Sequence, residues 1–253
     1  MTTKTPEEIK ILREGGKILA SVLYQVAEMA KPGVATIKLD EMAEKLIREA
    51  GGEPSFKNYK TAEDRIPYPV SLCVSINDEV VHGIPGPRKL EEGDIVSLDL
   101  GMKYKNLYTD TTVTVGAGII NERNKKLIET AKKSLDAGIK AIKEGKRIGD
   151  IGFTIQNFVE KNGFNVVKSL VGHGVGYKAH EEPEVPNFGR KGTGEILRTG
   201  MVLAIEPMVT DGESDVFLDN DGWTWKTKDG SYVAQFEHTV VVTKNGVEIL
   251  TCL

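Results

Sequence analysis

Two aspartates, Asp99 and Asp110, stand in neighbouring segments with the alternating, β-branched pattern of a β-hairpin, residues 95–102 and 107–115. With a turn at residues 104–105, Asp99 is predicted to lie directly opposite Asp110 on one face. The other face is apolar and carries Val96, Leu98, Leu100 and Met102. Facing aspartates have Cβ atoms about 5 Å apart and repel each other, so the pair would need a compensating cation. The alternative is a turn displaced by one residue, which would leave one aspartate as a solvated surface group.

Three more residues could bind the same cation. His173 lies between two glycines, which let a neighbouring group approach closely. Glu206 ends an apolar strand and precedes a proline that stops strand pairing. Glu237 lies inside a predicted strand, where a buried glutamate needs a partner. His173 could instead be a core histidine, and Glu206 a solvated glutamate at the end of a strand. His238, on the opposite face from Glu237, is predicted to be structural.

Together these residues contribute four carboxylates and one neutral imidazole. A single divalent ion would leave about two negative charges uncompensated, whereas two ions would neutralise the set. Carboxylate-rich sites with one imidazole suit pairs of Mn, Fe, Co or Zn ions and do not suit a structural zinc. Two such ions about 3.5–4 Å apart can share a bridging water, convert it to hydroxide and polarise a carbonyl group, which is hydrolytic chemistry. The sequence has no Walker A, GxGxxG, GxSxG or HExxH motif to suggest another chemistry.

Helices and short strands must position these residues. Apolar periodicity and capping signals predict the helices, at residues 6–30, 38–50, 122–142 and 150–161. Besides the hairpin, strands are predicted at residues 70–76, 166–171, 201–205 and 233–243. We expect an α+β fold in which the helices cover one face of a mostly antiparallel sheet.

The two helix pairs indicate an internal duplication. At an offset of 112 residues, Gly33 and Gly51 fall on Gly145 and Gly163, and the apolar positions of the helices coincide. The strands do not align at this offset, so chance agreement between two amphipathic helix pairs is the alternative. We therefore expect one domain over residues 1–253, built from similar halves at roughly 1–120 and 121–253.

The overall composition, 253 residues with 40% hydrophobic and 28% charged, fits one large globular domain. A net charge of −4 argues against a nucleic-acid partner, and the basic residues between 125 and 147 are explained as solvated helix faces. Two distant cysteines, Cys73 and Cys252, give neither a CxxC zinc pattern nor a disulfide framework. Without an apolar stretch near residue 1 or an uncharged apolar run of 18 residues, we expect no signal peptide, no membrane span and a cytoplasmic protein.

The sequence resembles the type I methionine aminopeptidases, in their short bacterial-type form. Members of this family have the creatinase-like pita-bread fold. Six segments that span most of the chain carry the resemblance: SLCVSINDEVVHGIPG (71–86), GDIVSLDLGMKYKNLYTDTTVTV (93–115), GHGVGYKAHEEPEVPN (172–187), GMVLAIEP (200–207), DGWTWKTKDGS (221–231) and AQFEHTVVVT (234–243). The resemblance implies hydrolytic removal of the initiator methionine from nascent chains with a small second residue, using a metal-bridging hydroxide. It also implies duplicated halves and a transient ribosome partner, and we expect a monomer.

The resemblance also assigns the metal ligands. They would be Asp99, Asp110, His173, Glu206 and Glu237. Asp110 and Glu237 would bridge the two ions. Asp99 would bind one ion, and His173 and Glu206 would bind the other.

Further roles follow from the same resemblance. Glu206 would relay the proton of the attacking water. His82 would lie beside the scissile residue, and His180 would contact the substrate carbonyl or the tetrahedral intermediate. An apolar pocket for an unbranched thioether side chain would be lined by Tyr68, Cys73 and Trp223.

Four departures from the family concern this pocket and leave the ligands untouched. Leu170, Val171 and Ala179 stand where the family often has an aromatic residue, a cysteine and a phenylalanine, and the segment 57–67 is longer or different. The absence of the phenylalanine at Ala179 leads us to expect a differently walled S1 pocket.

Two other functions remain open on the sequence alone. A proline-specific aminopeptidase or prolidase would have a similar site, but those chains usually carry an extra N-terminal domain, and the first helix here is expected to begin at residue 6. A binding protein that has lost catalysis would lack some of the ligands, and this chain has all five.

Overall fold

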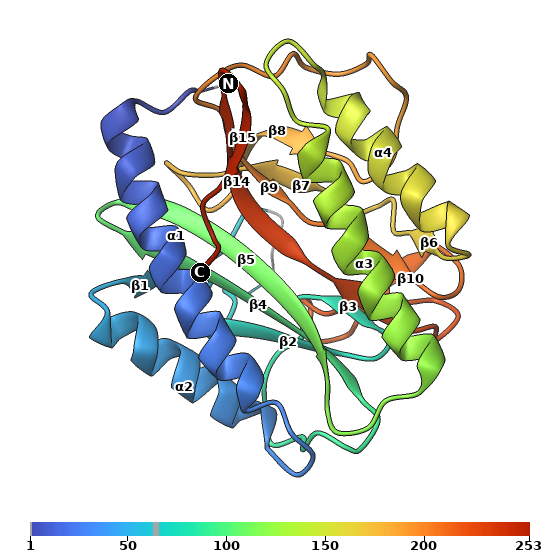
Figure 1. Cartoon of the computed structure of the whole chain (residues 1–253). Helices are drawn as coiled ribbons and strands as arrows, with labels where there is room; N and C mark the ends of the chain where they lie inside the picture. Colours follow the sequence, from blue (N-terminus) through green and yellow to red (C-terminus); the bar gives the residue numbers. More distant parts are fainter. Residues whose placement is uncertain (1, 63–65) are drawn as a thin grey trace.

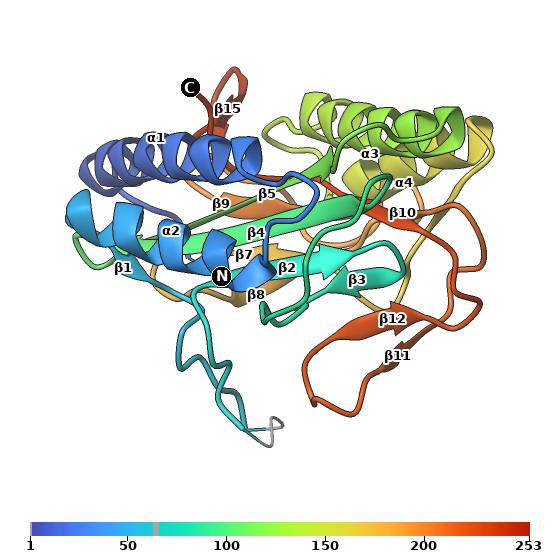
Figure 2. The same cartoon turned by 90° about the horizontal axis from the view of Figure 1, so that it is seen from below.

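The computed structural model describes residues 2–62 and 66–253, and its helices lie on one side of a curved sheet (Figures 1 and 2). The helices are α1 (Pro6–Glu28), α2 (Thr36–Glu49), α3 (Glu122–Lys140) and α4 (Ile148–Lys161). The four predicted helices are therefore confirmed, with ends that differ by at most two residues. At the start of α1, Thr5 and Glu8 form a capping box, in which each side chain accepts a hydrogen bond from the other residue's backbone N–H. Within the described ranges, no helix is long and apolar enough to cross a membrane.

The main sheet contains nine strands among the described residues. They are β1 (Glu53–Pro54), β2 (Leu72–Ile76), β4 (Ile95–Tyr104), β5 (Leu107–Gly116), β7 (Gly172–Gly174), β8 (Glu181–Val185), β9 (Val202–Ile205), β14 (Glu237–Thr243) and β15 (Gly246–Ile249). Their order is β1-β4-β5-β14-β9-β7-β8, with β2 beside β4 and β15 beside β14, and each of these pairs is antiparallel. Strand β14 thus joins β5 to β9 at the centre of the sheet (Figure 1).

Two smaller antiparallel sheets accompany the main one. The first contains β6 (Asn165–Val166), β10 (Met208–Thr210) and β13 (Val233–Gln235), and the second contains β3 (Glu79–Val81), β11 (Val216–Leu218) and β12 (Trp225–Thr227). Figure 2 shows the β11–β12 hairpin on the side of the main sheet away from the helices.

Two strand predictions were wrong in extent. The predicted strand at 166–171 ends at Val166, because the chain then leaves the sheet and residues 169–171 line a cavity. His173 consequently lies in the middle of the separate strand β7 rather than after a strand. The predicted strand at 233–243 is interrupted at Phe236, where the chain passes from the β10 sheet to the main sheet.

The core explains why the helices lie on one face. Val96, Leu98 and Leu100 of β4 pack against apolar residues of α1 and α2, and Leu203 and Val240 of β9 and β14 pack against α3 and α4. Full burial of each such side chain is worth about 1.5–3 kcal/mol. Because side chains alternate along a strand, the neighbouring polar residues point to the opposite, helix-free face.

The β4–β5 hairpin differs from the predicted register. Its loop is Lys105-Asn106, and both residues have positive φ (47° and 67°), which matches the type I′ turns favoured in two-residue hairpins. Asp99 therefore pairs with Thr112, and Asp110 pairs with Gly101. The prediction that Asp99 lies directly opposite Asp110 was wrong by two positions, because the turn was placed one residue too early. A shift of two preserves the face, so both aspartates still point to the same side.

The glycines that suggested a duplication share one backbone conformation. Gly33 and Gly145 have φ values of 87° and 83°, and Gly51 and Gly163 have 79° and 84°. Such values belong to the left-handed region that glycine adopts without strain. The glycines that follow the two helix pairs thus have the same backbone conformation. The duplication of whole halves stays a prediction.

Candidate metal and substrate site

Three neighbouring strands present a row of polar side chains on the helix-free face. Asp99 on β4 pairs with Thr112 on β5, which pairs with Glu237 on β14. The Thr112 Oγ1 atom lies 2.9 Å from Asp99 Oδ1 and 2.8 Å from Glu237 Oε2. A hydroxyl has one proton to donate, so Thr112 can donate to only one of the two carboxylates at a time. The row brings two acidic groups close together in a buried part of the sheet.

Asp110 and His173 complete a compact group of possible ligands with Glu237. One ligand atom from each of these three residues lies within 4.8 Å of the others. Asp110 is fixed by its backbone N–H, which donates to Thr239 Oγ1 at 2.9 Å. His173 Nδ1 lies 2.8 Å from the carbonyl oxygen of Gly174, an arrangement that favours the proton on Nδ1. The lone pair of Nε2 can then be offered to a metal ion.

Glu206 lies beside this group, directly after β9. Its Oε1 atom is 3.5 Å from His173 Nε2, and its Oε2 atom accepts a hydrogen bond of 3.1 Å from Gln235 Nε2. Its backbone carbonyl accepts from Asn187 Nδ2 at 3.1 Å. The alternative that Glu206 is a solvated residue at the end of a strand is therefore wrong, because its side chain is buried and hydrogen-bonded.

The carboxyl groups of this cluster would be stabilised in their charged form by bound cations. Burial raises the pKa of Asp99 to about 6, and burial followed by repulsion from neighbouring carboxylates raises the pKa of Asp110, Glu206 and Glu237 well above the usual range. Burial, with the nearby His180, lowers the pKa of His173 to about 3, so its imidazole is neutral. Glu237 Oε1 is buried without a hydrogen-bond partner among the described residues. Buried carboxylates, one neutral imidazole and an unpaired oxygen form a donor set that fits divalent cations.

A cavity of about 480 Å³ opens over this cluster. Its wall includes the ten site residues expected from the sequence: Tyr68, Cys73, His82, Asp99, Asp110, His173, His180, Glu206, Trp223 and Glu237. A volume of this size suits a small ligand or one side chain with adjacent backbone. The structure therefore brings together every residue that was predicted to bind metal or substrate.

Aromatic and imidazole rings form the rest of the wall. The ring centroids of His173 and His180 are 4.3 Å apart, and His180 Nδ1 lies 2.9 Å from the hydroxyl of Tyr59. The Trp223 ring meets Tyr68 edge-on at 5.2 Å and His82 at 6.1 Å. The cavity thus has a charged floor and an aromatic side.

Comparison with known proteins agrees with this geometry. The sequence model of metallopeptidase family M24 matches residues 10–244. The chain belongs to this family. A methionine aminopeptidase of Clostridium perfringens is 46% identical over 250 residues, which cover 99% of this chain and 98% of that protein. Methionine aminopeptidase 1 of Bacillus subtilis is 44% identical over 248 residues, 98% of each chain.

Solved M24 structures have the same fold. The methionine aminopeptidase of Rickettsia prowazekii superposes with a TM-score of 0.96 at 37% identity and full coverage of both chains. The prolidase of Pyrococcus horikoshii gives a TM-score of 0.76 at 23% identity, over 99% of this chain and 63% of that one, which shows the fold alone. The predicted pita-bread architecture, an α+β fold with a curved antiparallel sheet, is confirmed.

The sequence did not single out several residues of this M24 site. Tyr59 lines the cavity and contacts His180, but it lies in the atypical segment 57–67, part of which (63–65) is outside the described residues. Thr112 and Gln235 hydrogen-bond carboxylates that were predicted to be ligands, and their only sequence signal is a polar residue within a buried strand. Ala179 is buried next to His180 and does not itself line the cavity.

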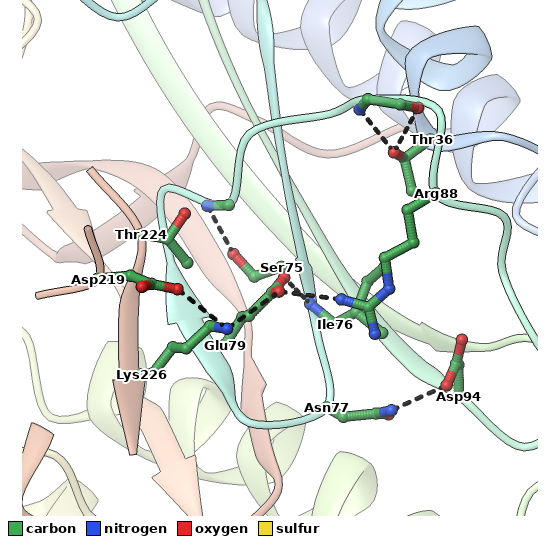
Figure 3. A network of polar contacts seen from close by, with 12 residues as sticks. Thr36, Ser75, Ile76, Asn77, Glu79, Arg88, Asp94, Asp219, Thr224 and Lys226 are labelled. Carbon is green, nitrogen blue, oxygen red and sulfur yellow. Dashed lines mark hydrogen bonds and ion pairs between the residues drawn. The ribbon is translucent and has the colours of Figure 1, made fainter. Parts of the chain in front are cut away.

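A polar network supports the wall that carries His82 and Trp223 (Figure 3). Glu79 on β3 accepts hydrogen bonds from the backbone N–H of Ile76 at 2.9 Å and from Arg88 Nη1 at 3.0 Å, and it lies 3.9 Å from Lys226 Nζ on β12. Lys226 also pairs with Asp219 at 3.1 Å. These contacts join β3, which precedes His82, to the β11–β12 hairpin, whose loop contains Trp223.

Proposed function

We propose that the chain is a methionine aminopeptidase, which hydrolyses the peptide bond after an N-terminal methionine when the second residue is small. The observation that carries the proposal is the cavity itself, in which a buried carboxylate and imidazole cluster adjoins an aromatic wall. Relatives named methionine aminopeptidase, identical at up to 46% over nearly the whole chain, support the same activity.

Five residues would hold two divalent ions. Asp110 and Glu237, whose ligand atoms lie within 4.8 Å of each other, would bridge the ions. Asp99 would complete one site, and His173 with Glu206 would complete the other. When bound, such ions lower the pKa of water and polarise a carbonyl group. Co, Mn, Fe and Zn all fit this donor set, and the order of affinities alone does not select among them.

The chain's own residues would bind the substrate and move its protons. Glu206, whose carboxylate accepts a hydrogen bond from the Gln235 amide, would accept a proton from the attacking water and pass it to the leaving amine. His82 would lie beside the scissile residue. His180, oriented by the Tyr59 hydroxyl, would contact the substrate carbonyl and the negative charge that develops there.

The aromatic side of the cavity would accept the methionine side chain. Tyr68 is fixed there because its hydroxyl donates to the carbonyl oxygen of Gly83 at 2.9 Å. Cys73 is buried on β2, and its thiol is kept protonated because burial raises its pKa. With Trp223 these residues give a polarizable, apolar surface that suits a thioether.

The decisive experiment is hydrolysis of Met-Ala-Ser compared with an Xaa-Pro peptide, with added Mn²⁺ or Co²⁺. We expect cleavage of Met-Ala-Ser, and much slower cleavage of the matched peptide Met-Leu-Ser, because its second residue is bulky. Cleavage of the Xaa-Pro peptide alone would replace the proposal with a proline-specific peptidase. No hydrolysis with any metal would favour a binding protein.

The finer features of the proposal need separate measurements. Metal analysis of protein purified without added metal, followed by titration, tests the two ions per chain and their identity. We also propose that the protein acts as a single-domain monomer in the cytoplasm, in transient contact with the ribosome, because its substrate is the start of a nascent chain. Sedimentation alone and with ribosomes tests the oligomeric state and this partner.

A further inference from the structure

Lys4 is a buried lysine in the short segment that precedes α1 (Figure 1). Its side chain is only 1% exposed, and lysine is almost never buried unless its charge is paired. The partner is the carboxylate of Glu181, which is also largely buried. Lys4 Nζ further lies 4.4 Å from the centroid of the Tyr177 ring, a cation–π contact.

The loop between β7 and β8 is shaped around this lysine. Gly176 has φ +133°, and a Cβ atom at this position would overlap Lys4 Cε. The Tyr177 hydroxyl donates to Glu8 Oε2 at 2.9 Å, so the same loop also contacts the first turn of α1. On the other side, the backbone N–H of Lys4 donates to the carbonyl oxygen of Gly200 at 2.8 Å. The segment before α1 is therefore held by a backbone hydrogen bond and by the ion pair of the Lys4 side chain.

The ion pair lies one residue away from the site. Glu181 directly follows His180 and begins β8, where it pairs with Gly174 of β7. His180 has its ring 4.3 Å from that of His173 and lines the cavity. A shift of Glu181 towards solvent would therefore change the position of the His180 backbone and its imidazole.

We propose that Lys4 is a positioning residue for His180, acting through the buried carboxylate of Glu181. The inference rests on the proposed aminopeptidase activity, in which His180 contacts the reacting carbonyl. Lys4 itself is not among the residues lining the cavity, so its effect on turnover has to pass through the β7–β8 loop. A residue that precedes the first helix would thus control the geometry of a histidine some 176 positions later (180 − 4).

The test compares wild-type protein with Lys4→Met, Glu181→Gln and the double variant, all loaded with Co²⁺ and assayed on Met-Ala-Ser. We expect each single variant to lose about tenfold or more in kcat, because small displacements of a catalytic group are costly, while KM changes little. The double variant should lose no more kcat than either single variant, because all three variants remove the same Lys4–Glu181 ion pair. The visible absorption of the bound Co²⁺ should stay unchanged, since the ligands are not touched.

Arg13→Met is the matched control. Arg13 on α1 pairs with Glu248 on β15, with Nη2 3.0 Å from Oε2, and this pair is partly exposed, with neither residue among those lining the cavity. We expect Arg13→Met to keep wild-type kcat. Retention of kcat within twofold by both single variants, additive losses in the double variant, or a parallel loss of Co²⁺ would overturn the role of Lys4. Inactivity of the wild-type protein on Met-Ala-Ser would instead refute the proposed function.

Discussion

Asp99 and Thr112 face each other across β4 and β5, with 2.9 Å between the carboxylate Oδ1 and the threonine hydroxyl. The same hydroxyl is 2.8 Å from Glu237 Oε2, so it lies within hydrogen-bond distance of two proposed ligands. Thr112→Val keeps the shape of the side chain and removes the hydroxyl. We expect the affinity for Mn²⁺ to fall about 10–100-fold, as for other groups that orient metal ligands. Calorimetric titration measures this affinity directly.

Thr109 provides a control on the same strand. It lies on the opposite face of β5, and its buried hydroxyl has no hydrogen-bond partner within the described ranges. Thr109→Val should therefore leave metal affinity unchanged and should cost no stability. Equal losses of affinity in the two variants would mean that the hydroxyl of Thr112 has no special role.

The central acids should be indispensable for turnover. Asp110→Asn and Glu237→Gln each remove one of the charges proposed to bridge the two ions, with little change in shape. We expect either variant to abolish hydrolysis of Met-Ala-Ser under saturating metal. If kcat stayed above about a tenth of the wild-type value, a barrier change under roughly 1.4 kcal/mol, the bridging assignment would be refuted.

Ala179 should influence the choice of N-terminal residue. It is buried directly before His180, whose ring contacts Tyr59, so the larger phenylalanine side chain can fit there only if its surroundings shift. We expect Ala179→Phe to change the ratio of kcat/KM values among peptides beginning with Met, Leu and norleucine. An unchanged ratio would show that this position does not shape the S1 pocket.

Glu44 on α2 should stabilise the protein in a pH-dependent way. Hydrogen bonds from Lys57, at 2.8 Å, and from Arg48 and Ser71 lower the pKa of Glu44 to about 2. A lowered pKa in the folded state means that the stabilisation is present above pH 4.5 and is lost as the pH falls towards about 2. Because these partners are partly exposed, Glu44→Gln should lower the free energy of unfolding at pH 7 by no more than about 1 kcal/mol.

Urea unfolding of both proteins at pH 7 and near pH 2 measures this difference. It should shrink at the lower pH, where the wild-type carboxylate is itself becoming neutral. Glu49→Gln on the same helix is the control, because the contact of Glu49 with Lys45 is long, at 3.9 Å, and exposed. A difference for Glu44→Gln that is the same at both pH values would exclude the charge as its cause.

The sequence was most informative where a periodic pattern coincided with burial. The alternation in β4 correctly assigned Leu98 to the core and Asp99 to the opposite face, because that property depends only on the parity of the strand. The partner of Asp99 depended on the two-residue loop at Lys105-Asn106, whose positive φ angles carry only a weak sequence signal without glycine. Contacts such as that of Tyr59 with His180 depend on a long loop packing against the distant β7–β8 loop, which no local pattern encodes.

Strand β14 has a consequence for the order in which the molecule assembles. It pairs with β5 on one side and β9 on the other, so Glu237 meets Thr112 across 125 positions of sequence. Contacts between such distant segments form late, because long loops must close before the contacts can stabilise anything. Until β14 docks, the β4–β5 hairpin carries two aspartates without the partners that would give them a metal ion. We therefore expect the chain to capture metal only once β14 has docked, so that a partly folded chain has no peptidase activity.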